Sequence, residues 1–143
     1  MNFETKDRKS LSDARMDKAK EFLSDSCATF NDARYRTSVN RAYYAALNAV
    51  RSLLILEGSD PGTHEGAATL LSLRFIKTGI LPVEVIKKFK MLLSRRTDVD
   101  YGDLDTIDAL DAEDSLKSAE LIIEYVDSIR KKLLAELTSR PAN

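Results

Sequence analysis

Apolar residues recur along most of the chain at steps of three and four residues, which places side chains on one face of a helix. One uninterrupted stripe shows the spacing plainly: Val39, Tyr43, Leu47, Val50 and Leu54. Turn and breaker residues interrupt the pattern at 57–62 and again around Gly79 and Pro82. The sequence therefore predicts five helices, over about 12–30, 32–56, 63–78, 82–96 and 112–137.

The connections between the predicted helices are short, which implies that neighbouring helices run antiparallel. We therefore expect an all-α fold, an up-and-down antiparallel bundle of about five helices. The chain has 143 residues, the usual size of one domain. We assign 1–143 to a single domain and expect flexible ends at 1–10 and 139–143.

The charge balance limits the classes of function. The chain has 22 Lys and Arg residues against 23 Asp and Glu residues, which gives a net charge of -1. A protein that coats DNA or RNA normally carries excess positive charge, so this class is disfavoured. A local basic pocket remains compatible with the composition.

The sequence predicts no metal site and no cofactor. Cys27 is the only cysteine and His64 the only histidine, so cysteine-based and multi-histidine metal sites are excluded. His64 could transfer protons near neutral pH, but its place beside a helix cap favours a structural or solvent-facing role. An acidic run lacks the central glycine and closing glutamate of a calcium loop, and we interpret it as solvated; it comprises Asp98, Asp100, Asp103, Asp105 and Asp108.

The first ten residues are charged and contain no apolar run of the kind found in signal peptides. No segment approaches the roughly 18 consecutive apolar residues that a membrane-spanning helix needs. We therefore expect a cytoplasmic protein that does not associate with membranes.

One arginine interrupts the apolar stripe of the fourth predicted helix. Arg96 follows Phe89 by seven residues and Leu92 by four, so helical spacing turns its side chain toward the core. A buried guanidinium needs a partner, and Asp100 lies four residues further on, where it could form an ion pair. Tyr101 follows directly.

The second predicted helix carries polar residues at the start of its apolar seam. If it packs antiparallel to the fourth helix, its polar end meets the end that carries Arg96. We then expect one shared pocket, made of Arg36, Asn40, Tyr43, Tyr44, Arg96 and Asp100. Such a network could bind a ligand, or it could only fix the register of the helices.

Four runs of residues, in the same order, resemble the motifs of HEPN domains, specifically small prokaryotic HEPN proteins with a Tyr-Tyr-Ala core. The first is SVNRAYYAA at 38–46, and the second is THEG at 63–66. The third is FIKTGILP at 75–82, and the fourth, RTDVDYG at 96–102, resembles the Arg-x-x-x-Asp-Tyr ending of these proteins.

The resemblance implies a helical bundle that is commonly dimeric. It also implies a partner, a minimal nucleotidyltransferase, in toxin–antitoxin pairs. Many HEPN toxins are metal-independent ribonucleases, in which an arginine is followed after four to six residues by a catalytic histidine. This sequence departs from that pattern, because Asp100 occupies the histidine position counted from Arg95, and Tyr101 occupies it counted from Arg96.

Three hypotheses follow. In the favoured one, the chain is a dimeric HEPN module that binds a nucleotidyltransferase and a nucleotide or RNA; the candidate binding residues are Arg95, Arg96, Asn40, Tyr44 and Arg36. In the second, it is a ribonuclease toxin with a variant site in which Arg96, Asp100 and Tyr101 are catalytic. In the third, it is a purely structural interaction module whose Arg96 network only sets helix packing.

Overall fold

The computed structural model describes residues 5–102 and 106–139. Three helices are long: α1 (Thr5–Asn31), α2 (Tyr35–Leu54) and α5 (Ala109–Ser139). Two further helices lie between α2 and α5 in the sequence, α3 (His64–Leu71) and α4 (Val83–Tyr101). Short segments extend two of the helices: a 3₁₀ turn, η1 (Ile55–Glu57), follows α2, and a π-helical segment, η2 (Ser72–Ile76), follows α3.

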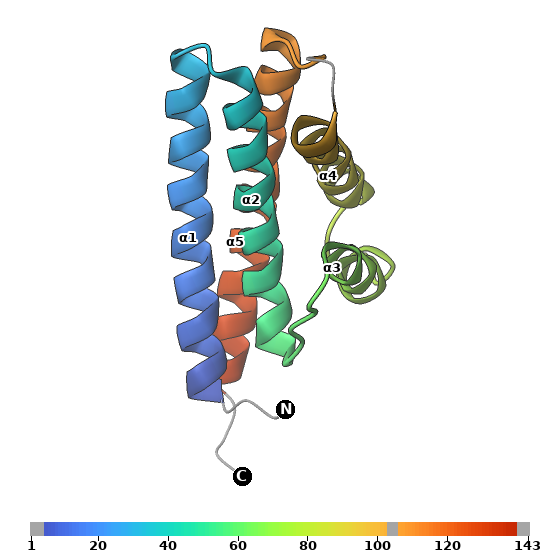
Figure 1. Ribbon diagram of the computed structural model, residues 1–143. Coiled ribbons are helices and arrows are strands. Elements are labelled where there is room, and N and C mark those ends of the chain that lie inside the picture. Colours follow the sequence, from blue (N-terminus) through green and yellow to red (C-terminus); the bar gives the residue numbers. More distant parts are fainter. Residues whose placement is uncertain (1–4, 103–105, 140–143) are drawn as a thin grey trace.

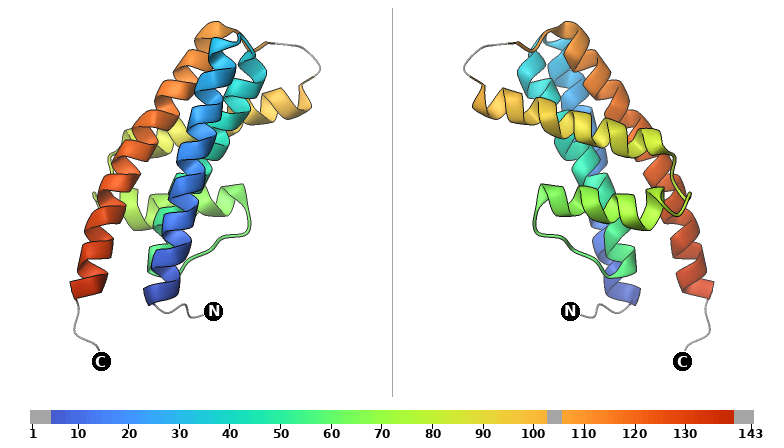
Figure 2. Two further views of the ribbon diagram at one scale, coloured as in Figure 1. Left: turned by 90° about the vertical axis from the view of Figure 1, so that its left-hand side faces the viewer. Right: turned by 90° about the vertical axis from the view of Figure 1, so that its right-hand side faces the viewer.

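The prediction of an all-α bundle of about five helices is confirmed. The helix α1 runs antiparallel to both α2 and α5, and the three pack against one another as an elongated three-helix bundle (Figure 1). The helices α3 and α4 lie across this bundle at a steep angle on one side (Figure 2). The first residue of α3, His64, consequently lies beside the middle of α2, where it contacts Tyr43.

The helix α2 is central because its residues are small or apolar on nearly every side. It packs against α1, α3, α4 and α5. Four of its alanines are fully buried, and their small side chains let neighbouring helices approach closely; they are Ala42, Ala45, Ala46 and Ala49. The large buried rings of Tyr43 and Phe89 fill the space between α2 and α4.

Several helix boundaries differ from the prediction. The helix α1 begins at Thr5, earlier than the predicted start at residue 12, so residues 5–10 are helical; residues 1–4 and 140–143, where the sequence predicts flexible ends, lie outside the described part. The helix α5 begins at Ala109 because Asp108 caps it: the Asp111 N–H donates to the Asp108 carboxylate at 2.9 Å. Asp103 and Asp105 of the acidic run also lie outside the described residues.

Three residues at the ends of helices have the hydrogen bonds or backbone conformations that the sequence predicts for them. The Thr63 hydroxyl accepts a hydrogen bond from the Gly66 N–H at 2.9 Å and caps α3. Gly79 has a φ of 79°, in the left-handed region that glycine adopts without strain. Pro82 precedes α4 in an extended conformation.

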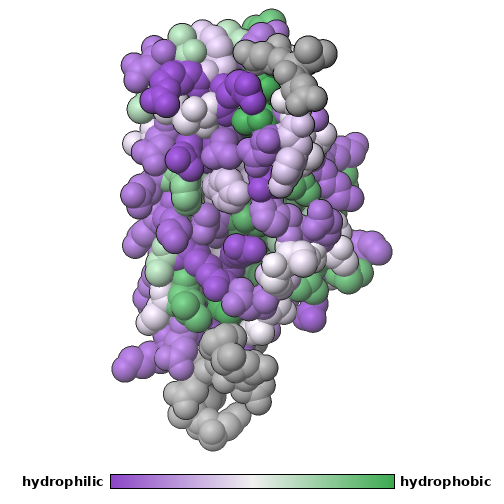
Figure 3. All heavy atoms as spheres, viewed as in Figure 1, coloured by the Kyte–Doolittle hydropathy of each residue, from purple (hydrophilic) through white to green (hydrophobic). Residues whose placement is uncertain are grey.

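The surface is mostly hydrophilic on the face shown in Figure 3, where apolar residues occur in small separate groups. None of the helices in the described part of the chain is both long and apolar enough to cross a membrane.

A buried ion-pair network joins α5 to α1. The Arg130 side chain donates to the Asp127 carboxylate from Nε at 3.0 Å and to the Asp13 carboxylate from NH1 at 2.7 Å. Lys20 of α1 also lies 3.2 Å from Asp127. Arg130 is only 8% exposed, so its charge depends on these partners.

We expect the substitution Asp127→Ala to lower the free energy of unfolding by about 3 kcal/mol, because it leaves the buried Arg130 charge with one carboxylate fewer. Urea denaturation measures this. The control is Glu113→Ala, which removes an exposed ion pair with Lys117 on the same helix and should cause no measurable change. Equal stability of Asp127→Ala and the unmodified protein would contradict the assigned role of the network.

Candidate functional site

Arg96 is the centre of the candidate site, and the prediction that it pairs with Asp100 is confirmed. Its side chain is 18% exposed, and its Nε lies 2.8 Å from the Asp100 carboxylate. Its NH2 donates a hydrogen bond to the Tyr44 hydroxyl at 3.2 Å. The guanidinium also lies 5.7 Å from the ring centroids of both Tyr43 and Tyr44, within the range of cation–π attraction.

The surroundings keep Arg96 charged. Burial alone would lower its pKa, but the hydrogen bond to Tyr44 and the negative charge of Asp100 outweigh it, and the pKa is raised. The side chain is therefore a fixed cation whose position is set by two aromatic rings and one carboxylate.

Tyr43 is buried and connects this cation to the only histidine. The Tyr43 hydroxyl is hydrogen-bonded to Nδ1 of His64, and the two rings are stacked with centroids 5.4 Å apart. Phe89 of α4 stacks on Tyr43 at 6.0 Å and fixes the plane of the phenol ring. Burial raises the pKa of Tyr43, so its hydroxyl stays protonated.

His64 is the site residue that sequence reasoning missed. It is the first residue of α3, half-buried, and its ring meets the Tyr44 ring edge-on at 6.4 Å. We define the Arg96 site as Tyr43, Tyr44, His64, Arg96 and Asp100. The only signal in the sequence was the THEG run, because nothing in the local spacing shows that α3 begins beside the middle of α2.

The charges around His64 favour its neutral form. Burial lowers the pKa of His64, and the positive charges of Arg96 and Arg51 lower it further, while Glu65 acts in the opposite direction. Arg51 lies on α2, its Nε is buried without a hydrogen-bond partner, and no ion pair is formed by it within the described part of the chain. The site thus combines positive potential with a neutral imidazole.

Two predicted residues on α2 lie outside this constellation. Arg36 is exposed and donates from NH2 to the backbone carbonyl of Val99 at 2.7 Å, which ties the start of α2 to the end of α4. The Asn40 side chain accepts from its neighbour Arg41 at 3.4 Å and is not hydrogen-bonded to Arg96.

Arg95 and Tyr101 also point elsewhere. Arg95 faces α5, where its NH1 donates to the Asp114 carboxylate at 2.8 Å and to the Ser115 hydroxyl at 3.0 Å. Tyr101, the last residue of α4, is 75% exposed. The structure therefore brings together four of the predicted residues, namely Tyr43, Tyr44, Arg96 and Asp100. It places Arg36, Asn40, Arg95 and Tyr101 around them or apart from them.

The Arg96 site places a guanidinium and an imidazole against the same pair of tyrosine rings. A guanidinium is the preferred partner of phosphate oxygens, and a neutral imidazole can accept a proton. The described residues contain no cluster of three His, Cys, Asp or Glu side chains that could hold a metal ion.

Because the chain has one histidine, nuclear magnetic resonance can follow its titration without assignment. We expect the pKa of His64 to lie below the ordinary 6.5 and to rise in Arg96→Ala, which removes a neighbouring positive charge. The control Arg15→Ala removes an arginine of α1 that pairs with Asp60, and it should leave the titration unchanged. A pKa at or above 6.5 in the unmodified protein would contradict the described environment.

Comparisons with known proteins find relatives that match most of the chain. A model of the HEPN domain family matches residues 12–131. A UPF0332 protein of Thermotoga maritima is 28% identical over 116 residues, which cover 81% of this chain and 88% of that protein. The protein named "Putative toxin MJ0605" of Methanocaldococcus jannaschii is 27% identical over 116 residues, which cover 81% of this chain and 86% of that protein.

A solved structure supports the fold. The crystal structure of TT1696 from Thermus thermophilus superposes with a TM-score of 0.72 at 18% sequence identity, and the match covers 82% of this chain and 96% of that one. The family match spans most of the chain and includes all four motifs that resemble HEPN domains. The chain therefore belongs to the HEPN domain family.

Proposed function

We propose that this chain is a toxin-type HEPN module that binds the phosphate of RNA or of a nucleotide at the Arg96 site. The observation that supports the proposal most is the environment of Arg96, a cation held against the rings of Tyr43 and Tyr44 with most of its surface removed from water. Tyr44 presents an aromatic ring beside it on which a base could stack.

The remaining binding residues surround this centre in the proposal. Arg36 and Asn40 extend the polar surface of α2 toward its first turn, and Arg95 adds positive charge next to Arg96 while it pairs with α5. The toxin-type role is supported by the M. jannaschii relative, whose name designates a toxin candidate.

The proposal includes two protein partners that the HEPN resemblance implies: a second copy of the chain and a minimal nucleotidyltransferase. Tyr101 and Leu110 are both about three-quarters exposed and flank the α4–α5 connection, so they offer apolar surface that a partner could cover.

Co-purification with the product of an adjacent gene tests the nucleotidyltransferase. A sedimentation mass equal to one chain would exclude the dimer.

We expect Arg96→Ala to weaken the binding of a short single-stranded RNA, or of adenosine monophosphate, at least about tenfold. A charge-assisted hydrogen bond contributes roughly 1.5–3 kcal/mol, and 1.4 kcal/mol corresponds to a factor of ten. Fluorescence anisotropy of a labelled RNA, with the mononucleotide as competitor, measures the effect. Arg15→Ala is the matched control, and equal losses in both variants would contradict a specific role for Arg96.

A second candidate function, a ribonuclease with a variant site, is favoured by the position of His64. Arg96 would stabilise charge on the phosphate. The sequence alone predicts Asp100 and Tyr101 as the groups that transfer protons. His64 is better suited to accept the proton of a ribose 2′-hydroxyl, because its lowered pKa keeps it neutral at pH 7.

Cleavage assays with purified protein distinguish the two candidates. Loss of cleavage in both His64→Ala and Arg96→Ala, together with loss of growth arrest on expression, would establish the ribonuclease. RNA binding without cleavage by the unmodified protein would exclude it and leave the binding function standing.

A further inference from the structure

The buried hydroxyl of Tyr43 has a single acceptor for its hydrogen. The side chain of Tyr43 is fully buried, and within the described residues its hydroxyl forms one hydrogen bond, to Nδ1 of His64. The guanidinium of Arg96 has no acceptor atom, and its NH2 donates to the neighbouring Tyr44 hydroxyl. The Tyr43 hydroxyl therefore satisfies its hydrogen only if it donates to Nδ1 of His64.

The direction of this hydrogen bond determines which nitrogen of His64 carries the proton. A neutral imidazole has one N–H donor and one acceptor nitrogen. If Nδ1 carried the proton, Nδ1 and the Tyr43 hydroxyl would both be donors, and a buried hydroxyl hydrogen would remain unpaired, which is unfavourable. Nδ1 is therefore the acceptor, and the proton of the neutral ring is on Nε2.

The second nitrogen of His64, Nε2, is free to meet a ligand. It forms no hydrogen bond with any residue of the described ranges 5–102 and 106–139. It is also not one of the buried polar atoms that lack a partner, and the His64 side chain is only half-buried. Nε2 is therefore in contact with solvent and can donate to a bound molecule.

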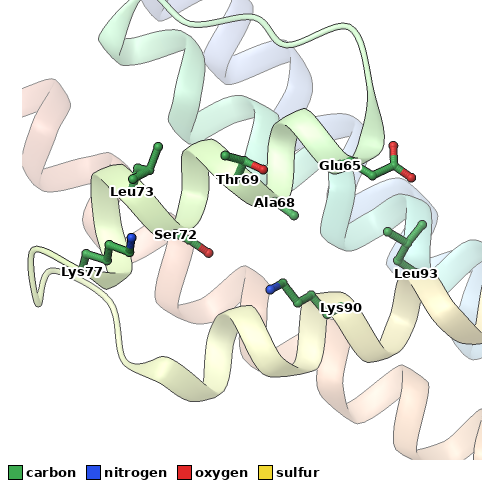
Figure 4. A pocket seen from close by; sticks show the side chains of 8 residues that line it. All are labelled: Glu65, Ala68, Thr69, Ser72, Leu73, Lys77, Lys90 and Leu93. Carbon is green, nitrogen blue, oxygen red and sulfur yellow. The ribbon is translucent and has the colours of Figure 1, made fainter.

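The carboxylate that follows His64 in the sequence does not bind this nitrogen. Glu65 lines a groove of about 480 Å³ between α3 and α4, and no residue of the Arg96 site lines that groove (Figure 4). In the described part of the chain, no ion pair joins Glu65 to His64. Burial and the charges of Arg96 and Arg51 outweigh the effect of Glu65, and the pKa of His64 is lowered. The ring is therefore neutral, as the assignment of its proton requires.

Ring stacking holds the imidazole beside the cation of the site. The His64 and Tyr43 rings are stacked with an angle of 10° between their planes, and Phe89 stacks on Tyr43 at 17°. The Arg96 guanidinium lies 5.7 Å from the centroid of the same Tyr43 ring. A cationic donor and a neutral N–H donor are thus held against one tyrosine.

We propose that Tyr43 is a positioning residue that fixes the tautomer of His64, so that His64 presents Nε2–H as a hydrogen-bond donor to the phosphate bound by Arg96. The inference rests on the proposed function of the Arg96 site. A neutral imidazole can act as a donor of this kind. The ligand class is then an anion with at least two acceptor oxygens, one for the guanidinium and one for the imidazole, and a phosphate ester meets this requirement.

The assignment gives His64 a role different from that of a general base. A base needs a lone pair on the nitrogen that faces the substrate. With the proton on Nε2, the lone pair of the ring is on Nδ1, where the Tyr43 hydroxyl donates to it. In this tautomer His64 stabilises a bound phosphate and does not take the proton of a ribose 2′-hydroxyl.

Nitrogen-15 magnetic resonance of the one histidine reports the tautomer. At a pH above the titration of the imidazole, we expect Nε2 to resonate as a protonated nitrogen and Nδ1 as an unprotonated one. In Tyr43→Phe, which keeps the stacked ring and removes only the hydroxyl, the two resonances should move toward each other, because the tautomers then exchange. A proton on Nδ1 of the unmodified protein, or a spectrum that Tyr43→Phe leaves unchanged, would overturn the assignment.

The matched control for this spectrum is Tyr35→Phe. Tyr35 also lies on α2, where its ring packs against Phe30, and its hydroxyl forms no hydrogen bond with the residues that the structure describes. Loss of this hydroxyl should leave both nitrogen resonances of His64 unchanged.

Binding of adenosine monophosphate to the full chain tests the donor role. We expect His64→Ala to bind about tenfold more weakly, because it loses a hydrogen bond to a charged oxygen. His64→Gln should bind more tightly than His64→Ala, because its amide can donate although it cannot act as a base. Equal binding by the two variants, or an RNA cleavage activity that His64→Gln abolishes, would overturn the donor role. Circular dichroism melting verifies that both variants fold.

The two experiments separate the inference from the proposal on which it rests. If the unmodified protein carries the proton on Nε2 but does not bind adenosine monophosphate, the proposed phosphate function fails. If it binds adenosine monophosphate through Arg96 but carries the proton on Nδ1, or if His64→Ala binds as tightly as the unmodified protein, the inference fails and the Arg96 site stands.

Discussion

The guanidinium of Arg96 is a permanent charge that the fold holds largely out of water, and the arrangement of α2, α3 and α4 is adapted to it. Removing such a charge from water is unfavourable unless acceptors replace the lost hydration. The Asp100 carboxylate, on the next turn of α4, compensates for part of the lost hydration, and the Tyr44 hydroxyl on α2 compensates for a further part. The tyrosine rings provide the rest through their electron-rich faces, and the same packing brings His64 beside Tyr43.

Local spacing predicts the part of this arrangement that a single helix determines. The helices follow from apolar periodicity, and the pairing of Arg96 with Asp100 follows from their separation by four residues. The position of His64 could not be predicted in this way, because the connection at 58–63 and the oblique crossing of α3 decide where α3 begins. The expected contact of Asn40 with Arg96 assumed that α2 and α4 lie alongside each other, whereas α4 crosses α2 (Figure 2).

Two adjacent arginines of α4 have different partners, because the helix turns them in different directions. Successive residues of a helix point about 100° apart. Arg95 therefore meets α5, where Asp114 and Ser115 satisfy it, while Arg96 meets the tyrosines of α2. Arg95 thus holds α4 against α5, and it adds positive charge beside Arg96 in a chain whose net charge is only -1.

The free energy of unfolding of Arg96→Met tests most directly whether Arg96 serves a ligand or the fold. Methionine keeps an apolar side chain against the tyrosine rings, and the Asp100 carboxylate is exposed enough to be solvated when its partner is lost. Removal of one partner of an ion pair is strongly destabilising where the remaining charge is buried, and Asp100 is exposed. We expect the variant to be at least as stable as the unmodified protein in urea denaturation. A loss of about 3 kcal/mol or more would contradict this account and show that Arg96 primarily maintains the helix packing.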